Sequence, residues 1–486
     1  MQESRQEEGR DFEIFPAMAV DEQEQDDPGP RHSKITAELI VNLEDPVLVY
    51  SKSSQSSHQV LYLSHLDRQA PLFMYSLYFY RSGGDSGVFD RLRDAMERNL
   101  VPHFPAAGRI RYGESGEPEL HCGDQGVVLV EASTDARIDD FGDMRDANQE
   151  FEKFVYKIPP SSDTALIVAQ VTRCGCGGFV IGFGSRHELF DGLSALHFLS
   201  DWAALARGGV EEIEPPCQDR QRLRPKIKAE EPDRAIDLGE LYRERFQGIP
   251  LLRPGSASAA ESIEEYLGAR HKCRVKALSI SDEMIQRLKA RAMDRDEGSA
   301  LSSCTTFEVL AAHAWLARIK ALEIGDGERA LLEFTVNTRP KIDLPHRFMG
   351  NAFIMAYSNA AAGNLLSAPF HAVVGAIQSA KASVTEDYIW GSIDALRAAH
   401  SVKGSSGLLP SFRQTTIVSD WTRFSFDQLD FGWGAAAFAT PVAMLLPDVL
   451  FLLRDGMDKR RICLKLGLMP HTMEKFEKNF YDLGSS

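Results

Sequence analysis

Cysteine is scarce in this 486-residue chain, and its seven copies are scattered along it. An odd number of scattered cysteines excludes a small fold held together by disulfides. The spacing Cys174-Gly-Cys176 fits neither a zinc knuckle nor a redox pair, and no set of His, Cys and Asp has the spacing of metal ligands. We therefore expect reduced thiols, a cytoplasmic protein and no metal.

Basic residues are outnumbered, with 54 Lys and Arg against 70 Asp and Glu and a formal net charge of −16. A surface with this balance does not favour nucleic acid as a partner. The first twenty residues also lack the basic start and the apolar run of a secretory signal peptide.

A long uninterrupted apolar run is missing as well. The stretch from Gly432 to Leu453 has about the length of a bilayer span, but Pro441, Pro447 and Asp448 interrupt it. We interpret it as buried strands joined by a turn, so no membrane span is expected.

Composition divides the chain into four parts. Residues 1–33 hold ten acidic residues against three arginines, a net charge of −7, and are expected to be a disordered acidic tail. Residues 211–268 become charged and proline-rich, which is typical of a linker. The linker separates a first domain at 34–210 from a second at 269–486.

Both halves contain strand and helix signals. In the first half we expect a strand at 35–41, a helix at 92–100, a strand at 179–183 and a helix at 193–205. In the second half we expect a strand at 272–280, helices at 306–322 and around 370–382, and β-rich sequence over 415–468. The pattern predicts two α/β halves of similar size.

The first motif with chemical potential is His187-Glu-Leu-Phe-Asp191-Gly192, between an expected strand and an expected helix. A neutral imidazole there can accept a proton from an attacking hydroxyl and return it to a leaving group. Asp191 could orient that ring or anchor the loop, and Gly192 is expected to permit a backbone bend that a Cβ would forbid. Alone, this pattern is weak, because short motifs also occur by chance.

Two further segments accompany it. Ser419-Asp-Trp421 precedes Asp430-Phe-Gly432-Trp433-Gly434, in which two glycines around a tryptophan indicate a tight turn with the indole buried. Arg339 begins a turn-rich loop that runs to Asn351 and is a candidate partner for a buried carboxylate.

Together these motifs resemble the plant BAHD acyltransferases, which use acyl-coenzyme A donors. HxxxDG and DFGWG both occur, in the family's order and about 240 residues apart. The resemblance covers nearly everything after residue 35, including four further segments: Leu61–Asp67, Pro105–Arg109, Ala169–Arg173 and Cys304–Glu308.

The resemblance implies a two-domain α/β fold of the chloramphenicol-acetyltransferase type, with mixed sheets and a channel between the domains. It implies that His187 is the general base, that Asp191 pairs with Arg339, and that Ser419 and Trp421 donate to the oxyanion. Asp430, Gly432, Trp433 and Gly434 would shape the fold, together with Gly192. It further implies a monomer with acyl-CoA as co-substrate and no permanently bound cofactor.

Elementary chemistry agrees with these roles. A thioester is already activated, so the enzyme has to deprotonate an alcohol and stabilise the oxyanion that forms. A hydroxyl and an indole N–H can both donate to that oxygen.

Two positions depart from the family. Glu188 stands where the family more often has Thr, and we expect it to point outward into solvent because Glu is seldom fully buried. Lys341 stands where the family usually has a second arginine after Arg339.

Within the family, the amino-acid sequence around residues 304–315 and 419–424 is most similar to that of the branch that transfers hydroxycinnamoyl groups to long-chain ω-hydroxy acids and fatty alcohols. Two alternatives stay open. The acceptor could be small and polar, such as shikimate or an amine. The chain could also be a non-catalytic member that serves another enzyme as an accessory or binding protein.

Overall fold

The computed structural model describes most of the chain after residue 38. The described residues are 39–53, 58–114, 116–141, 144, 149–158, 163–209, 213–225, 245–249, 251–252, 273–296, 298–401, 409–442, 449–455 and 461–483. The predicted acidic tail at 1–33 and most of the predicted linker at 211–268 lie outside them.

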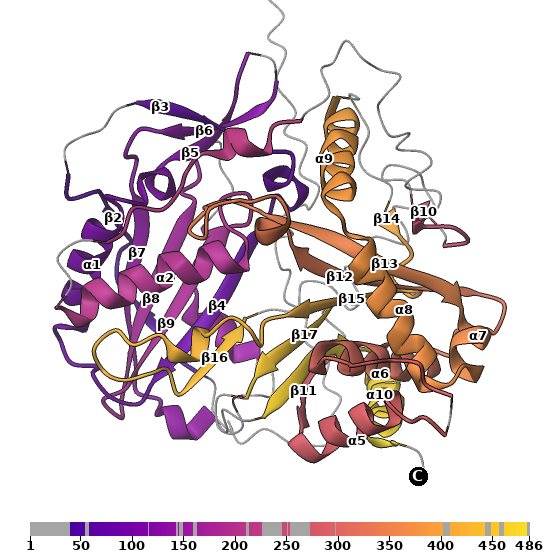
Figure 1. Cartoon of the computed structure of the whole chain (residues 1–486). Helices are drawn as coiled ribbons and strands as arrows, with labels where there is room; N and C mark the ends of the chain where they lie inside the picture. The colour runs from indigo at the N-terminus through magenta and orange to yellow at the C-terminus, as the bar shows by residue number, and fades with distance from the viewer. Residues whose placement is uncertain are drawn as a thin grey trace, which may run out of the picture.

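The first half of the chain builds one lobe around a seven-stranded sheet (Figure 1). Its strand order is β1-β7-β8-β9-β4-β16, with β2 also paired to β7. The strands are β1 Asn42–Leu43, β2 Val47–Val49, β4 Phe73–Tyr80, β7 Val127–Thr134, β8 Ile167–Cys174, β9 Phe179–Arg186 and β16 Phe438–Pro441. Helices α1 (Val88–Asn99) and α2 (Gly192–Arg207) lie side by side and pack against this lobe's apolar core. Beside it, β3 (Gln59–Tyr62), β6 (Pro118–Cys122) and β5 (Arg109–Tyr112) form a small sheet.

The second half builds another lobe around a six-stranded sheet (Figure 1). Its order is β11-β18-β17-β15-β12-β13, in which β12, β15 and β17 run parallel and the other neighbours are antiparallel. The strands are β11 Arg274–Ile280, β12 Arg329–Asn337, β13 Phe353–Ala361, β15 Thr415–Asp420, β17 Val449–Arg454 and β18 Ile462–Leu468. The helices are α5 Asp282–Ala292, α6 Thr306–Ala321, α7 Ala362–Ser367, α8 Phe370–Ser383, α9 Glu386–Ser401 and α10 Pro470–Tyr481, and β10 (Leu251–Leu252) pairs with β14 (Leu409–Pro410).

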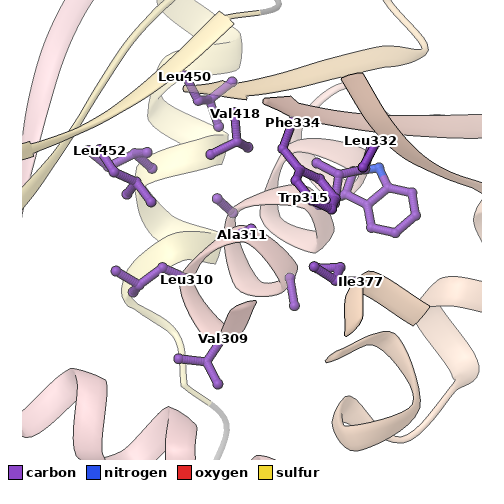
Figure 2. Packing of buried hydrophobic residues seen from close by; sticks show 14 of the residues in the cluster. Val309, Leu310, Ala311, Trp315, Leu332, Phe334, Ile377, Val418, Leu450 and Leu452 are labelled. Carbon is purple, nitrogen blue, oxygen red and sulfur yellow. The ribbon is translucent and has the colours of Figure 1, made fainter. Parts of the chain in front are cut away.

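Helix α6 lies at the centre of the second lobe. Apolar residues surround it on all sides, as expected for a helix packed between a sheet and other helices. Figure 2 shows Trp315 of this helix packed near Leu332, with Val418 and Leu450 of the sheet nearby. Thr305 and Glu308 close its first turn with a capping box, which is why the helix begins at Thr306 as predicted.

Strand β16 crosses from one half of the chain to the other. It comes from the second half in sequence, yet it pairs with β4 in the first lobe's sheet, with Phe438 opposite Phe79 (Figure 1). The apolar stretch 432–453 therefore does contain two strands, as predicted, but β16 and β17 belong to different sheets, and residues 443–448 between them lie outside the described part. Among the described helices, none has the length and apolar character needed to cross a bilayer.

The loop between β12 and β13 makes a second crossing. It leaves the second sheet, reaches α2 of the first lobe and returns (Figure 1). Met349 at its far end belongs to the first lobe's apolar core. This loop brings Arg339 and Asn351 beside the HxxxDG motif.

One predicted strand is wrong in the residues that the structure describes. Residues 39–41 of the predicted strand 35–41 are outside any strand, and β1 begins at Asn42. The Leu39 N–H donates to a carboxylate oxygen of Glu150 at 3.0 Å, and the Leu39 carbonyl accepts from Lys153. Side chains therefore take the place of a neighbouring strand.

Candidate active site

His187 follows directly after β9, in the short loop that leads into α2. Its N–H donates to the Leu72 carbonyl at 2.8 Å, and its own carbonyl accepts from the Asn351 amide at 2.7 Å. The backbone of the candidate base is thus held by chain segments on both sides of it.

The imidazole of His187 is half-buried and meets the ring of Phe353 edge-on, with 5.9 Å between ring centroids. Its Nδ1 atom is enclosed and has no hydrogen-bond partner among the described residues. Enclosure of Nδ1 leaves Nε2 as the atom suited to exchange a proton with substrate.

Glu188 is placed differently from our expectation. The prediction of an outward, solvated Glu is wrong, because the side chain is only 5% exposed. Arg186 donates to both of its carboxylate oxygens, at 2.8 Å to Oε2 through Nε, and this partner makes the burial tolerable. Burial raises the pKa of Glu188, while Arg186 and the neighbouring His187 act in the opposite direction.

The predicted pair of Asp191 and Arg339 is confirmed. Arg339 donates to both carboxylate oxygens, from Nη1 to Oδ2 at 2.8 Å and from Nη2 to Oδ1 at 3.0 Å. The same carboxylate caps α2 by accepting from the Ser194 N–H, and it accepts from the Ala352 N–H. Burial alone would raise the pKa of Asp191, but Arg339 and the two backbone donors hold that pKa below its usual value. The contacts with Arg339 and Ala352 tie the two lobes together, and none of the Asp191 contacts reaches the His187 ring.

Gly192 needs its small size for a reason that the sequence did not indicate. Its backbone is the ordinary first residue of α2, so the expected special bend is wrong. A Cβ on Gly192 would lie 2.7 Å from the ring of Phe424, three residues after Trp421. The glycine therefore allows the segment that follows Ser419 and Trp421 to lie against the start of α2.

Ser419 and Trp421 contact each other. Ser419 lies at the end of β15, and the Trp421 indole N–H donates to its Oγ at 3.2 Å. The indole packs edge-on against Phe451 and tilted against Phe426. With the indole N–H directed at Ser419, the Ser419 hydroxyl is the group of the pair that remains able to donate to a substrate oxygen.

The DFGWG segment forms a tight turn, as predicted. The Asp430 carboxylate accepts from the Gly432 and Gly434 N–H groups at 2.7 and 2.9 Å. Both glycines have positive φ, 106° and 89°, a region that other residues rarely adopt. The indole of Trp433 is half-buried rather than buried as predicted, and the Arg91 guanidinium lies 4.4 Å from the centre of its ring.

A cavity of about 360 Å³ is lined by Asp420 and Thr422, the two sequence neighbours of Trp421. It opens where β15 and β17 end and α6 begins, the kind of crevice that binds ligands at the carboxyl ends of parallel strands. Its lining includes three arginines, one carboxylate and the first residues of α6: Arg423, Arg454, Arg461, Asp420, Thr305, Thr306 and Phe307. Guanidinium groups together with a helix N-terminus suit an anion such as phosphate. We did not predict this cavity from the sequence, although Arg423, only two positions after Trp421, was a signal for it.

A second, much smaller pocket lies against Trp421. It offers only about 20 Å³ and is walled mainly by aromatic rings: Tyr78, Trp421, Phe424 and Phe426. Asp427, Ser76 and Thr440 add polar groups. A space of this size holds about one water molecule and does not admit an aromatic ring.

The two-lobed fold and this site define an acyl-CoA-dependent acyltransferase. Vinorine synthase has the same fold, with a TM-score of 0.67 and 19% identity over 90% of this chain and 96% of that one. TRI101 of F. graminearum, solved with coenzyme A and deoxynivalenol, gives 0.64 and 14% over 86% of this chain and 96% of that one. Within the described part of the chain, no cluster of His, Cys, Asp or Glu could hold a metal ion.

The Transferase family model matches residues 47–483, and the chain belongs to this family, the BAHD acyltransferases. It is 30% identical to brassinosteroid-related acyltransferase 1 of Arabidopsis thaliana over 87% of this chain and 94% of that protein. It is 29% identical to omega-hydroxypalmitate O-feruloyl transferase of the same plant, over 92% and 93%. It is 30% identical to the Arabidopsis fatty alcohol:caffeoyl-CoA acyltransferase, over 90% and 98%.

Proposed function

We propose that the protein transfers a hydroxycinnamoyl group from its coenzyme A thioester to a lipid-like alcohol, forming an ester. The observation that supports this most directly is the meeting of HxxxDG and the Ser419–Trp421 segment, through the contact of Gly192 with Phe424. This contact supports a site in which the base comes from one lobe and the oxyanion donor from the other.

The proposed reaction is a direct transfer. His187 Nε2 takes the proton of the acceptor hydroxyl as its oxygen attacks the thioester carbonyl. Ser419, polarised by the Trp421 N–H, donates to the oxygen anion. When the tetrahedral intermediate collapses, the C–S bond breaks and the departing thiolate of coenzyme A receives the proton from His187.

The larger cavity suits the phosphates of the donor. We place these phosphates in the arginine-lined cavity of Arg423, Arg454 and Arg461, because guanidinium groups bind phosphate well. A donor bound there would extend its thioester toward Ser419.

A substrate panel tests the proposal. The purified protein is given feruloyl-, caffeoyl-, benzoyl- or acetyl-CoA with a fatty alcohol, an ω-hydroxy acid, shikimate or an amine, and products are identified by mass spectrometry. We expect ester formation with a hydroxycinnamoyl donor and a long-chain alcohol. Transfer to shikimate or an amine instead would show that the acceptor is a small polar molecule and not a lipid-like alcohol. Binding of thioesters without any transfer would favour a role as a non-catalytic accessory protein.

We further infer that the enzyme acts in the cytoplasm as a monomer. All seven cysteines are free, which suits a reducing compartment. His187, Ser419 and Trp421 all come from one chain, so the site needs no second copy. Light scattering of the purified protein tests the monomer, and imaging of a fluorescent fusion tests the compartment.

A further inference from the structure

A short piece of the predicted linker carries a buried arginine. Within residues 213–225, Arg220 starts a single helical turn and is only 2% exposed. Cys217, just before it, exchanges backbone hydrogen bonds with the β12–β13 loop, donating to the Arg347 carbonyl at 2.9 Å and accepting from Met349 at 2.8 Å. The segment is thus fixed to the loop that carries Asn351.

Arg220 contacts the loop of the proposed base. Its Nη2 donates to the Leu189 carbonyl at 3.0 Å, two residues after His187. Its Nε lies 3.5 Å from Oδ2 of Asp67, whose side chain is fully buried. The buried cation and the buried carboxylate offset each other's charge, while Nη1 of Arg220 donates to Gln218 Oε1 at 3.4 Å and Nη2 donates to the catalytic loop.

Asp67 connects Arg220 to a second contact with the same loop. Its Oδ1 accepts from the backbone N–H of Asn351 at 2.7 Å and from the Asn351 amide at 3.1 Å. That amide also donates to the His187 carbonyl at 2.7 Å. The carbonyls of His187 and Leu189 are therefore held by two groups that share one carboxylate.

The packing around this network leaves no spare space. A Cβ on Gly350 would lie 3.2 Å from Nε of Arg220 and 3.3 Å from Oδ1 of Asp67. Groups from residues 67, 220 and 350–351 converge here, although they are far apart in sequence. The network is separate from the Asp191–Arg339 pair, which holds the other end of the loop.

We propose that Arg220, Asp67 and Asn351 are positioning residues, which set the angle of the His187 imidazole by holding the carbonyls of His187 and Leu189. This inference rests on the proposed role of His187 as general base. None of the three side chains needs to touch substrate.

The first test uses Asn351→Ala and Arg220→Lys. Asn351→Ala removes the amide bond to the His187 carbonyl but keeps the backbone N–H bonded to Asp67, so the fold has the better chance of surviving. Arg220→Lys keeps the positive charge beside Asp67. The single ammonium group of Lys cannot also donate to the Leu189 carbonyl, as the forked guanidinium does. We expect kcat to fall roughly 10–100-fold in each, as for other groups that orient a catalytic residue, with the donor Kd changed less than about threefold. Arg222→Lys, an exposed neighbour on the same turn, is the matched control.

The second test combines each substitution with His187→Ala. If the network acts through the imidazole, it has nothing left to position, and the second substitution lowers the residual rate no further. An equal fold-loss in both backgrounds, or wild-type kcat in a folded Asn351→Ala protein, would overturn the inference. Full activity of His187→Ala alone would instead overturn the proposed function, so the two failures are distinguishable.

Discussion

At the scale of single residues, the chemistry depends on what surrounds His187. Neighbouring residues enclose the Nδ1 atom, Leu72 and Asn351 hold the backbone by hydrogen bonds, and Arg186 neutralises the neighbouring Glu188. Asp191, four residues on, belongs to an ion pair that joins the lobes and has no contact with the ring. The imidazole is therefore expected to act without a carboxylate partner.

Replacing His187 by Ala removes the proposed base. We expect kcat to fall roughly 10²–10⁴-fold, the usual contribution of a general base, while the donor Kd stays nearly unchanged because no donor contact is lost. Steady-state kinetics and calorimetric titration of donor measure the two quantities. His471→Ala, at an exposed position, serves as control. A donor Kd that rises in step with the loss of kcat would contradict the role.

The hydrogen bond between Trp421 and Ser419 leads to a second expectation. Ser419→Ala removes the proposed oxyanion donor and should cost roughly 10²–10³-fold in kcat, whereas Ser419→Thr keeps a hydroxyl and should retain most activity. Trp421→Phe should cost less, because its N–H acts through Ser419. The double variant Ser419→Ala/Trp421→Phe should be no slower than Ser419→Ala. Additive losses in kcat would instead show that both groups donate directly.

At the scale of elements, the sequence predicts what is local and misses what depends on a distant partner. Helix α2 and its cap follow from Asp191 and the apolar run behind it, and the predicted range 193–205 is close to the observed Gly192–Arg207. The pattern of β16 predicts a strand, but periodicity carries no information on which sheet receives it. Arg220 lies in a charged, proline-rich segment, so averaged composition conceals its burial.

Helix α2 also carries a group that makes its contact with the β12–β13 loop sensitive to pH. His197 lies on this helix, 5.3 Å from the ring of His346 on the loop. Burial lowers the pKa of His197 to about 4, with further lowering by Arg347, His346 and Arg339 against the opposing effect of Asp201. Between pH 6.5 and 4 the unfolded chain therefore binds a proton that the folded chain does not, and stability is lost as the pH falls.

We expect His197→Gln to make this loss shallower. Thermal unfolding at steps from pH 7 to pH 4 measures it, and the difference in Tm between variant and wild type should shift in favour of the variant by a few degrees across the window. His471→Gln, an exposed histidine on α10, should follow the wild type. Parallel curves for His197→Gln and wild type would exclude this helix as a source of the acid sensitivity.

At the scale of the whole molecule, two crossings hold the lobes in the relation that the site needs. The β12–β13 loop brings Arg339 to Asp191, and β16 places a strand of the second half in the first sheet. Where β16 meets the second sheet, Lys465 of β18 donates to Thr440 Oγ1 at 2.7 Å and to the Pro441 carbonyl at 2.8 Å. This lysine is 2% exposed, and no carboxylate of the described residues pairs with it.

The buried Lys465 makes the stability of the contact between the lobes depend on pH in the alkaline range. Burial lowers its pKa from 10.5 to about 8, so between these values the unfolded chain holds a proton that the folded chain has released, and stability rises with pH. Below pH 8 the same shift represents a penalty of roughly 3 kcal/mol to the stability of the folded chain.

Lys465→Met removes the charge, and Thr440 can still donate to the Pro441 carbonyl. We therefore expect the variant to be at least as stable as wild type at pH 7, because replacing a buried charge by an apolar group is often neutral or stabilising. The variant should also lack the rise in stability between pH 8 and 10.5. Unfolding in urea across this range measures the slope, with Lys475→Met, which breaks only an exposed pair with Glu323, as control. A Lys465→Met protein whose stability still rises with pH as in wild type would show that Lys465 is not the source of this pH dependence.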